Sequence, residues 1–141
     1  MDEVTAVERM ARVADRLAAR ELAPRPFLRA FAWNCARIRP GLLGYRDLAT
    51  GGRNRFTGSG FRAEFDDGTR GQVRHFAGVA VAPVLLGERL AAWSSRHVLR
   101  DPAGSADGRL SDAALEFSRL LREGRLSPDD AGNWIRDHLA A

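Results

Sequence analysis

The sequence predicts a mostly α-helical fold, a compact orthogonal bundle of about six helices that forms one domain over residues 1–141. A chain of 141 residues has the size of one ordinary domain and buries a core without disulfides or metals. Its hydrophobic fraction of 45% and charged fraction of 28% are those of a globular protein. In most segments apolar residues recur at three-residue and four-residue spacing, and prolines and glycines separate these segments.

The first two helices are expected at about residues 2–23 and 26–39, because Pro24 and Pro40 end the two periodic segments. Each carries one apolar stripe that faces the core. The stripe of the first helix consists of Val7, Met10, Ala14 and Leu17, and that of the second of Phe27, Phe31, Cys35 and Ile38.

Residues 41–60 contain six glycines and no sustained periodicity, which predicts one long Gly-rich loop with at most a short helical turn near Leu48. Apolar and charged residues then alternate from Phe61 to Phe65, and a turn follows. This alternation is compatible with a short hairpin near residues 61–72. We favour a short extended piece followed by a helix capped around Thr69, since the sequence after the turn does not alternate.

Four helices are expected in the second half of the chain. The first ends at Pro83 and is apolar nearly all round, with Val73, Phe76 and Ala80 on one face, which indicates a central buried helix. The next extends to about residue 100 and is followed by a polar loop. The last two begin at N-capping serines, Ser111 and Ser127.

Composition limits the classes of function. All 22 basic residues are arginine, which is typical of a GC-rich bacterial genome, so the net charge of +4 is weak support for nucleic-acid binding. The single cysteine, Cys35, excludes an intramolecular disulfide, and no zinc or cofactor motif occurs. The N-terminus lacks the pattern of a secretory signal, and the longest apolar stretch, residues 76–87, is too short for a membrane span. We therefore expect a cytoplasmic protein, although export by a signal-independent route would leave the same sequence.

The candidate catalytic residues are Arg74 and His75, with Glu64 and Asp67 upstream of them. His75 is expected one turn into its helix, where the helix dipole favours the neutral imidazole that a general base requires. Glu64, Asp67 or the neighbouring Asp66 would orient the ring or serve as the acid, and Arg74 would contact an anionic group. The alternative is structural: His75 bonds a backbone carbonyl while Arg74 pairs with an acid. Ser111 has no matching histidine and acid in the sequence, so we expect no serine nucleophile.

The candidate ligand-binding residues are Arg53, Arg55, Phe56 and Arg62, which lie among glycines. Guanidinium groups and one aromatic ring are the groups that contact phosphates and bases. A solvated loop in an arginine-rich chain is the alternative interpretation.

The segment Gln72-Val73-Arg74-His75-Phe76, followed by a small-residue apolar helix and an Asp-led helix at Asp112, resembles uncharacterised small helical bacterial domains, some associated with polymorphic toxins and secreted effectors. The resemblance implies no defined reaction. Two functional hypotheses follow from the residues: a hydrolase of a polar or anionic substrate with its site at the start of the His75 helix, or a binding module that contacts an acidic protein or nucleic acid through the arginine-rich loop.

Overall fold

The computed structural model of the protein describes residues 4–40, 42–50, 52–58, 60–66, 68, 70–87 and 105–141. These residues form six α-helices and one short 3-10 helix, in a compact helical bundle that confirms the predicted fold class. The elements are α1 (Ala6–Ala18), α2 (Pro24–Ala36), α3 (Leu42–Thr50), η1 (Ala63–Phe65), α4 (Gln72–Leu86), α6 (Ala106–Arg122) and α7 (Pro128–Leu139).

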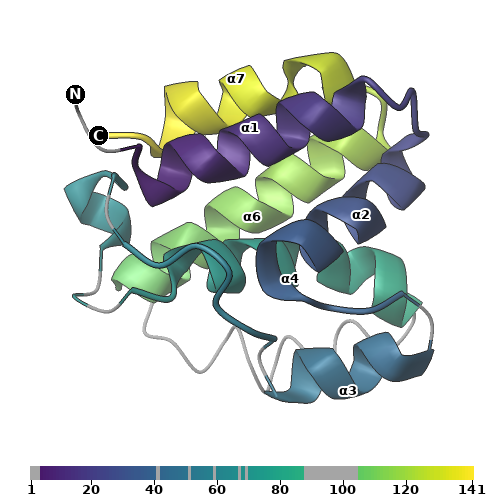
Figure 1. The fold of residues 1–141 in the computed structure, drawn as a ribbon, viewed down its shortest axis with the longest axis horizontal. Helices are drawn as coiled ribbons and strands as arrows, with labels where there is room; N and C mark the ends of the chain where they lie inside the picture. Colours follow the sequence, from purple (N-terminus) through teal and green to yellow (C-terminus); the bar gives the residue numbers. More distant parts are fainter. Residues whose placement is uncertain are drawn as a thin grey trace.

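α4 is the central buried helix that the sequence predicts, because ten of its fifteen residues are buried. α1 and α7 lie side by side along one edge of the bundle (Figure 1). α4 packs against both α2 and α6, and α3 packs against α4.

A cluster of aromatic rings joins four helices at the centre of the core. The Phe117 ring of α6 has its centroid 5.6 Å from that of Phe31 in α2, 5.3 Å from that of Phe76 in α4 and 5.1 Å from that of Trp134 in α7. The three phenylalanines are fully buried, whereas Trp134 remains partly exposed at the edge of the core. Phe31 and Phe76 come from the predicted apolar faces, so the periodicity identified the core-facing sides of α2 and α4.

Local hydrogen bonds explain where α1 and α7 begin. The Thr5 hydroxyl accepts from the amide of Glu8 at 3.1 Å and caps α1. Ser127 caps α7 in the same way and is followed by Pro128 in the first turn, which confirms the predicted start of the last helix.

The long loop predicted at residues 41–60 is wrong over its first half, which is the nine-residue helix α3. A tertiary interaction holds this helix: the Asp47 carboxylate accepts from the backbone amide of Arg39 at 2.8 Å and from its guanidinium at 2.9 and 3.0 Å. Leu48 of this helix is buried. Residues 52–58 and 60 contain no helix and form the remaining Gly-rich segment.

The expected break at Pro83 is also absent, because α4 continues through this residue to Leu86. Proline removes only one backbone donor, and the buried neighbours Ala82 and Val84 keep the last turn in the core. Gly71 occupies the N-cap position, and Thr69, the predicted cap, lies outside the described residues, as does the helix expected up to residue 100 beyond Gly87. None of the described helices is both long enough and apolar enough to cross a membrane.

α6 begins at Ala106 rather than at Ser111. The Ser105 hydroxyl accepts from the amide of Gly108 at 3.1 Å, and Asp107 lies in the first turn, where the helix dipole favours a carboxylate. Ser111 and Asp112 are therefore interior residues of α6 and do not begin it.

No hairpin forms near residues 61–72 within the described ranges. Phe61 instead makes an isolated antiparallel bridge with Ala140, and Ala141 donates its amide to the Gly60 carbonyl at 2.8 Å. The backbone groups of this extended piece thus pair with the C-terminal residues, which follow it by almost 80 positions along the chain.

Candidate functional site

His75 lies one turn into α4, on the side that packs against α6. Its amide donates to the Gly71 carbonyl at 3.0 Å, and its Nε2 lies 2.7 Å from the Oγ of Ser111. Ser111 is fully buried and His75 is partly exposed. The imidazole is therefore fixed from its buried side by a hydroxyl of a neighbouring helix.

The Ser111 partner was not predicted. The sequence pattern predicts Ser111 at a helix start, where its hydroxyl would be occupied by capping. With α6 beginning at Ala106, Ser111 and Ser118 lie seven residues apart on the buried stripe that also carries Ala114 and Leu121. Because a buried hydroxyl needs a hydrogen-bond partner, a serine on an apolar stripe was the available signal that another helix supplies one.

Arg74 precedes His75 and is partly exposed. Its guanidinium forms no hydrogen bond or ion pair with any residue in the part of the chain that the structure describes. A partly buried cation without a carboxylate partner differs from the ion-paired arginine that the structural interpretation of the sequence expected.

Gly71 allows the loop to approach the start of α4. A Cβ at this position would stand 3.3 Å from the Arg74 guanidinium and 3.6 Å from the Asn54 side-chain oxygen. Asn54 lies between Arg53 and Arg55, so the structure brings the predicted loop residues close to the predicted catalytic pair. The two candidate sites, which the sequence analysis treated separately, are neighbours.

Of the predicted acid partners, Glu64 and Asp66 are described, and neither is hydrogen-bonded to His75. The Glu64 carboxylate lies 4.0 Å from the Arg62 guanidinium, and the Glu64 backbone carbonyl accepts from Arg109 at 2.8 Å. Asp66 accepts from the amide of Gly68 at 2.9 Å and organises the turn before α4. Asp67 lies outside the described residues. Among the described residues, the partner of His75 is a hydroxyl and not a carboxylate.

Asp66 also contacts α4 directly. Its Oδ1 accepts from the Nε2 of Gln72 at 3.1 Å, and Gln72 is buried in the first turn of the helix. This bond ties the preceding turn to the start of α4, so Asp66 supports the backbone on which Arg74 and His75 stand.

The predicted ligand-binding residues divide into two groups. Arg53 and Arg55 lie beside α2: the amide of Arg53 donates to the Ala36 carbonyl, and the Arg55 guanidinium donates to the Asn34 carbonyl at 3.4 Å and lies 5.7 Å from the Phe56 ring centroid. Arg62 has a structural role, because its side chain donates to the backbone carbonyls of Asp137 and Ala140 at the end of α7. We therefore withdraw Arg62 from the ligand-binding set: capping these carbonyls occupies its guanidinium.

Other reactive groups offer no competing site. His138 stacks on Trp134 with ring centroids 4.4 Å apart and hydrogen-bonds the Trp134 carbonyl. Cys35 is buried, and this burial raises the pKa of its thiol, which disfavours the reactive thiolate. The described ranges contain no group of three or more histidine, cysteine, aspartate or glutamate residues placed to hold a metal ion. His97 lies outside them.

Comparison with known proteins adds no assignment: no protein-family model, no curated protein and no solved structure matches this chain.

Proposed function

We propose that the protein hydrolyses an anionic substrate at the start of α4, with His75 as general base and Arg74 as the contact for negative charge. The observation that carries this proposal is the 2.7 Å contact between His75 Nε2 and Ser111 Oγ. It holds a partly exposed imidazole in one orientation beside an arginine without a partner in the described part of the chain.

The chemistry needs one tautomer of His75. When Nε2 carries the proton it donates to Ser111 Oγ, and Nδ1 presents its lone pair. Nδ1 then removes a proton from a water molecule as the water oxygen bonds to the acyl or phosphoryl centre of the substrate. The resulting imidazolium returns the proton to the leaving group when its bond breaks. The Arg74 guanidinium stabilises the negative charge that develops between these two steps.

The test is a panel of three substrates with the full chain: a chromogenic carboxylic ester, a chromogenic phosphodiester and a fluorescent single-stranded oligonucleotide. We expect turnover of at least one, a loss of about a hundredfold or more in His75→Gln, and an unchanged rate in the matched variant His138→Gln. The melting temperature of His75→Gln should stay close to that of the wild type. Two results would refute the catalytic role of His75. The first is unaltered turnover in His75→Gln. The second is that His75→Gln unfolds while Ser111→Ala keeps full activity.

A second candidate is a binding module that uses Arg53, Arg55 and Phe56 on a nucleic acid or an acidic protein. The observation that favours it is the position of Asn54, whose side-chain oxygen lies close to Gly71 as the Arg74 guanidinium does, so the segment that carries Arg53 and Arg55 passes near a further arginine. The double variant Arg53→Gln/Arg55→Gln should weaken binding of the labelled oligonucleotide and flatten its salt dependence. Binding that persists in His75→Gln, without turnover in the wild type, would favour this module over the hydrolase.

A further inference from the structure

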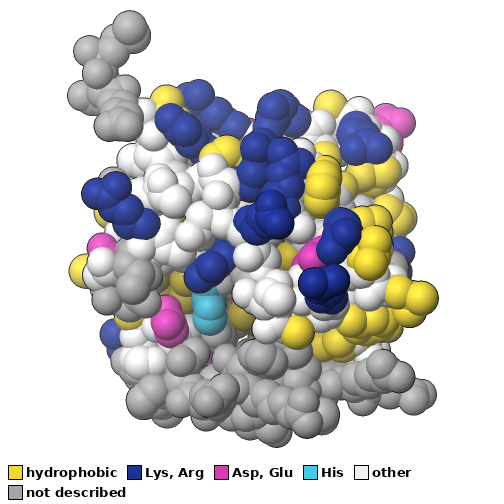
Figure 2. Space-filling model, turned by 60° about the horizontal axis from the view of Figure 1, so that its bottom comes forward, with side chains coloured by type: hydrophobic (Ala, Val, Ile, Leu, Met, Phe, Trp, Pro, Cys, Tyr) yellow, Lys and Arg dark blue, Asp and Glu magenta, His cyan; other side chains and the backbone are white. Residues whose placement is uncertain are grey.

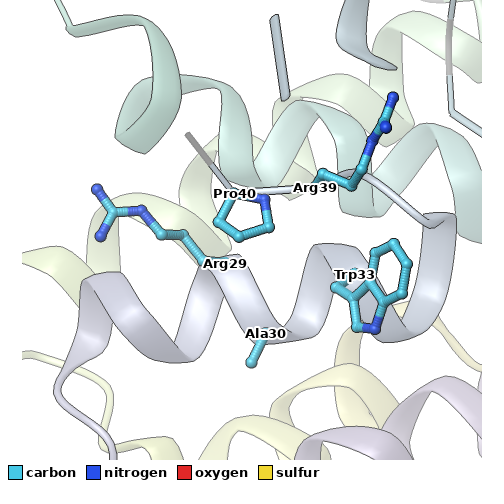
Figure 3. A pocket seen from close by; sticks show the side chains of 5 residues that line it. All are labelled: Arg29, Ala30, Trp33, Arg39 and Pro40. Atoms are coloured by element: carbon cyan, nitrogen blue, oxygen red, sulfur yellow. The ribbon is translucent and has the colours of Figure 1, made fainter. Parts of the chain in front are cut away.

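The described surface contains an open pocket that none of the predicted site residues lines. It lies between one side of α2 and the segment that leads into α3, and its volume is about 390 Å³. Its lining consists of Arg29, Ala30, Trp33, Arg39 and Pro40, with Arg29 at one end and Trp33 at the other (Figure 3). It does not include Arg74 or His75, so it is separate from the site proposed above.

The surroundings of this pocket are apolar and exposed. Trp33 has 40% of its surface exposed, and Leu42 and Leu43, which closely follow Pro40 in the sequence, have 83% and 52% exposed. Figure 2 shows apolar side chains gathered along one edge of the molecule, near arginines. Trp33 lines the pocket, and the two leucines follow its Pro40 wall within three residues of chain, so exposed apolar side chains lie close to it and indicate a contact surface for another molecule.

The charge at the pocket is positive. The Arg37 guanidinium stacks over the Trp33 ring at 4.7 Å from the centroid. Arg37 and Arg29 form no ion pair with a carboxylate within the described ranges. Arg39 differs from them, because Asp47 neutralises it. Two uncompensated cations therefore stand beside an apolar pocket.

We propose that this pocket is the docking site for an acidic, amphipathic segment of a partner protein. One apolar side chain of that segment enters the pocket against Trp33, and its carboxylates pair with Arg29 and Arg37. The exposed leucines extend the contact along α3. A protein segment fits better than a nucleic acid because the lining is apolar and Leu42 and Leu43 offer nothing to phosphates or base edges.

The probe is a fluorescently labelled synthetic helix, free of tryptophan, with leucine and phenylalanine on one face and glutamate on the other. Its matched control has glutamine in place of glutamate. We expect anisotropy to show that the full chain binds the acidic peptide and binds the control at least tenfold more weakly at low salt. Trp33→Ala should weaken binding about tenfold or more, and Arg29→Gln about threefold, since aromatic and arginine anchors dominate such interfaces. Arg20→Gln, in an exposed arginine after α1, should leave the affinity unchanged.

Trp33→Phe serves as the conservative variant. It should retain most of the affinity while the peptide-induced shift in tryptophan emission disappears, which assigns that shift to Trp33. Equal binding by Trp33→Ala and the wild type, with an unchanged melting temperature, would overturn the proposal. So would displacement of the peptide by a single-stranded oligonucleotide, or binding of the chain to vesicles of anionic lipid but not to the peptide.

Discussion

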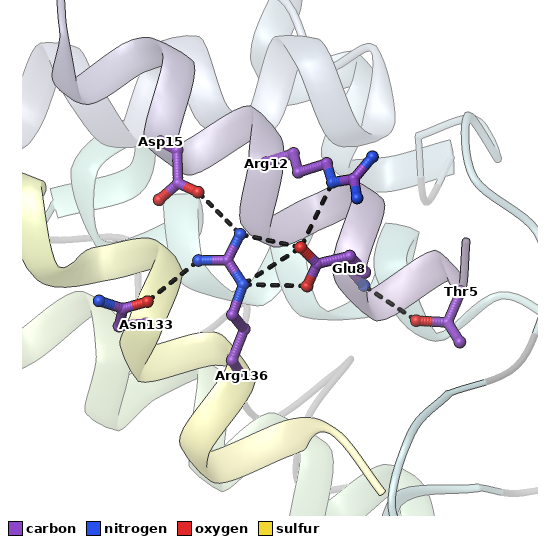
Figure 4. A network of polar contacts seen from close by, with 6 residues as sticks. All are labelled: Thr5, Glu8, Arg12, Asp15, Asn133 and Arg136. Carbon is purple, nitrogen blue, oxygen red and sulfur yellow. Dashed lines mark hydrogen bonds and ion pairs between the residues drawn. The ribbon is translucent and has the colours of Figure 1, made fainter. Parts of the chain in front are cut away.

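Two arginines of this protein occupy opposite situations. Arg136, on α7, donates to both carboxylate oxygens of Glu8 at 2.9 and 3.0 Å and to Asp15 at 2.7 Å, and it contacts Asn133 at 3.1 Å (Figure 4). Arg74, at the start of α4, forms no such bond in the part of the chain that the structure describes. One guanidinium joins two helices, and the other remains available to a ligand.

The difference teaches how to interpret a chain whose 22 basic residues are all arginine. Net charge does not distinguish an arginine that fixes the fold from one that binds a ligand, whereas the bonding of each guanidinium does. Glu8 shows the energetic side of a fixed pair: hydrogen bonds from Arg136 lower the pKa of its carboxyl group. Substitutions at the α1–α7 contact should therefore cost more stability than a substitution of Arg74.

Gly132→Ala should have the largest effect. Gly132 lies where α7 approaches α1 most closely: a Cβ there would stand 2.9 Å from the Ala11 backbone oxygen and would collide with the Asp15 carboxylate. α1 and α7 must then move apart, which also disturbs the hydrogen bond that Arg136 donates to Asp15. We expect a loss of about 3 kcal/mol in the free energy of unfolding, measured by urea denaturation.

A second helical glycine provides the control. A Cβ on Gly78 in α4 would meet only the Ile38 side chain, at the ordinary contact distance of 3.5 Å. Because alanine favours a helix over glycine, Gly78→Ala should be neutral or stabilising by up to about 1 kcal/mol. Equal destabilisation by the two substitutions would show that the close approach of α1 and α7 is not the cause.

Arg136→Gln should lower the free energy of unfolding by about 1 to 2 kcal/mol, because it removes bonds to Glu8 and Asp15 on another helix. The matched control is Arg119→Gln. Arg119 pairs with Glu116 and Glu123 on its own helix, at exposed positions, so its loss should cost less than about 0.5 kcal/mol. A cost for Arg136 no greater than that for Arg119 would contradict the inter-helix role.

Glu8→Gln removes a carboxylate that pairs with Arg136 and with Arg12, so its effect should depend on pH. Since the pKa of Glu8 is lowered in the folded protein, its ionised form contributes stability above the unfolded pKa of about 4.3, and this contribution is lost as pH falls through the folded pKa. The variant should be less stable than the wild type by about 0.5 to 1 kcal/mol at pH 7, where the exposed edge of the pair is screened.

Urea unfolding midpoints of Glu8→Gln and the wild type, measured between pH 7 and pH 3, would test the direction of this effect. The difference in stability between the two proteins should shrink as the pH falls. The pKa of Asp47 is lowered as well, by its bonds to Arg39, but Asp47 is present in both proteins and its contribution cancels. A gap that widens as the pH falls would contradict the assignment to Glu8.

The sequence predicted the helices and their buried faces because these depend on local spacing. Phe31, Phe76 and Phe117 each have apolar neighbours one helical turn away. A helix face made of such residues is buried in the core. α3 was missed because a contact outside the helix, from Asp47 to Arg39, stabilises it, and its glycine-rich surroundings favour a loop when considered alone.

The candidate site was predictable only in part. His75 and Arg74 were identified from their own segment, but the partner of His75 is 36 positions away on α6. Only the packing of α4 against α6 brings that serine to it. Arg62 illustrates the converse: beside glycines it resembled a ligand contact, and its actual partners are carbonyls 75 and 78 positions away at the end of α7. Residues that meet across such separations leave no trace in local spacing.

Arg74→Gln should have the smallest effect on stability and completes the comparison with Arg136. With no bond to lose among the described residues, the free energy of unfolding should change by less than about 0.5 kcal/mol. The same change should weaken binding of an anionic substrate, because the guanidinium is the cation nearest to His75 in sequence on α4. Paired measurements of unfolding and of substrate affinity, over a range of salt concentration, would check both statements.

The pairing of the two measurements decides what Arg74 does. If Arg74→Gln destabilises the fold as much as Arg136→Gln, then the contact of its guanidinium with the Gly71 turn is structural and both arginines serve the fold. If stability is retained and affinity for the anionic substrate falls with a reduced salt dependence, then Arg74 contributes to binding and not to the stability of the fold. In that case ligand binding, and not folding, explains why Arg74 pairs with no carboxylate among the described residues, whereas Arg136 pairs with two.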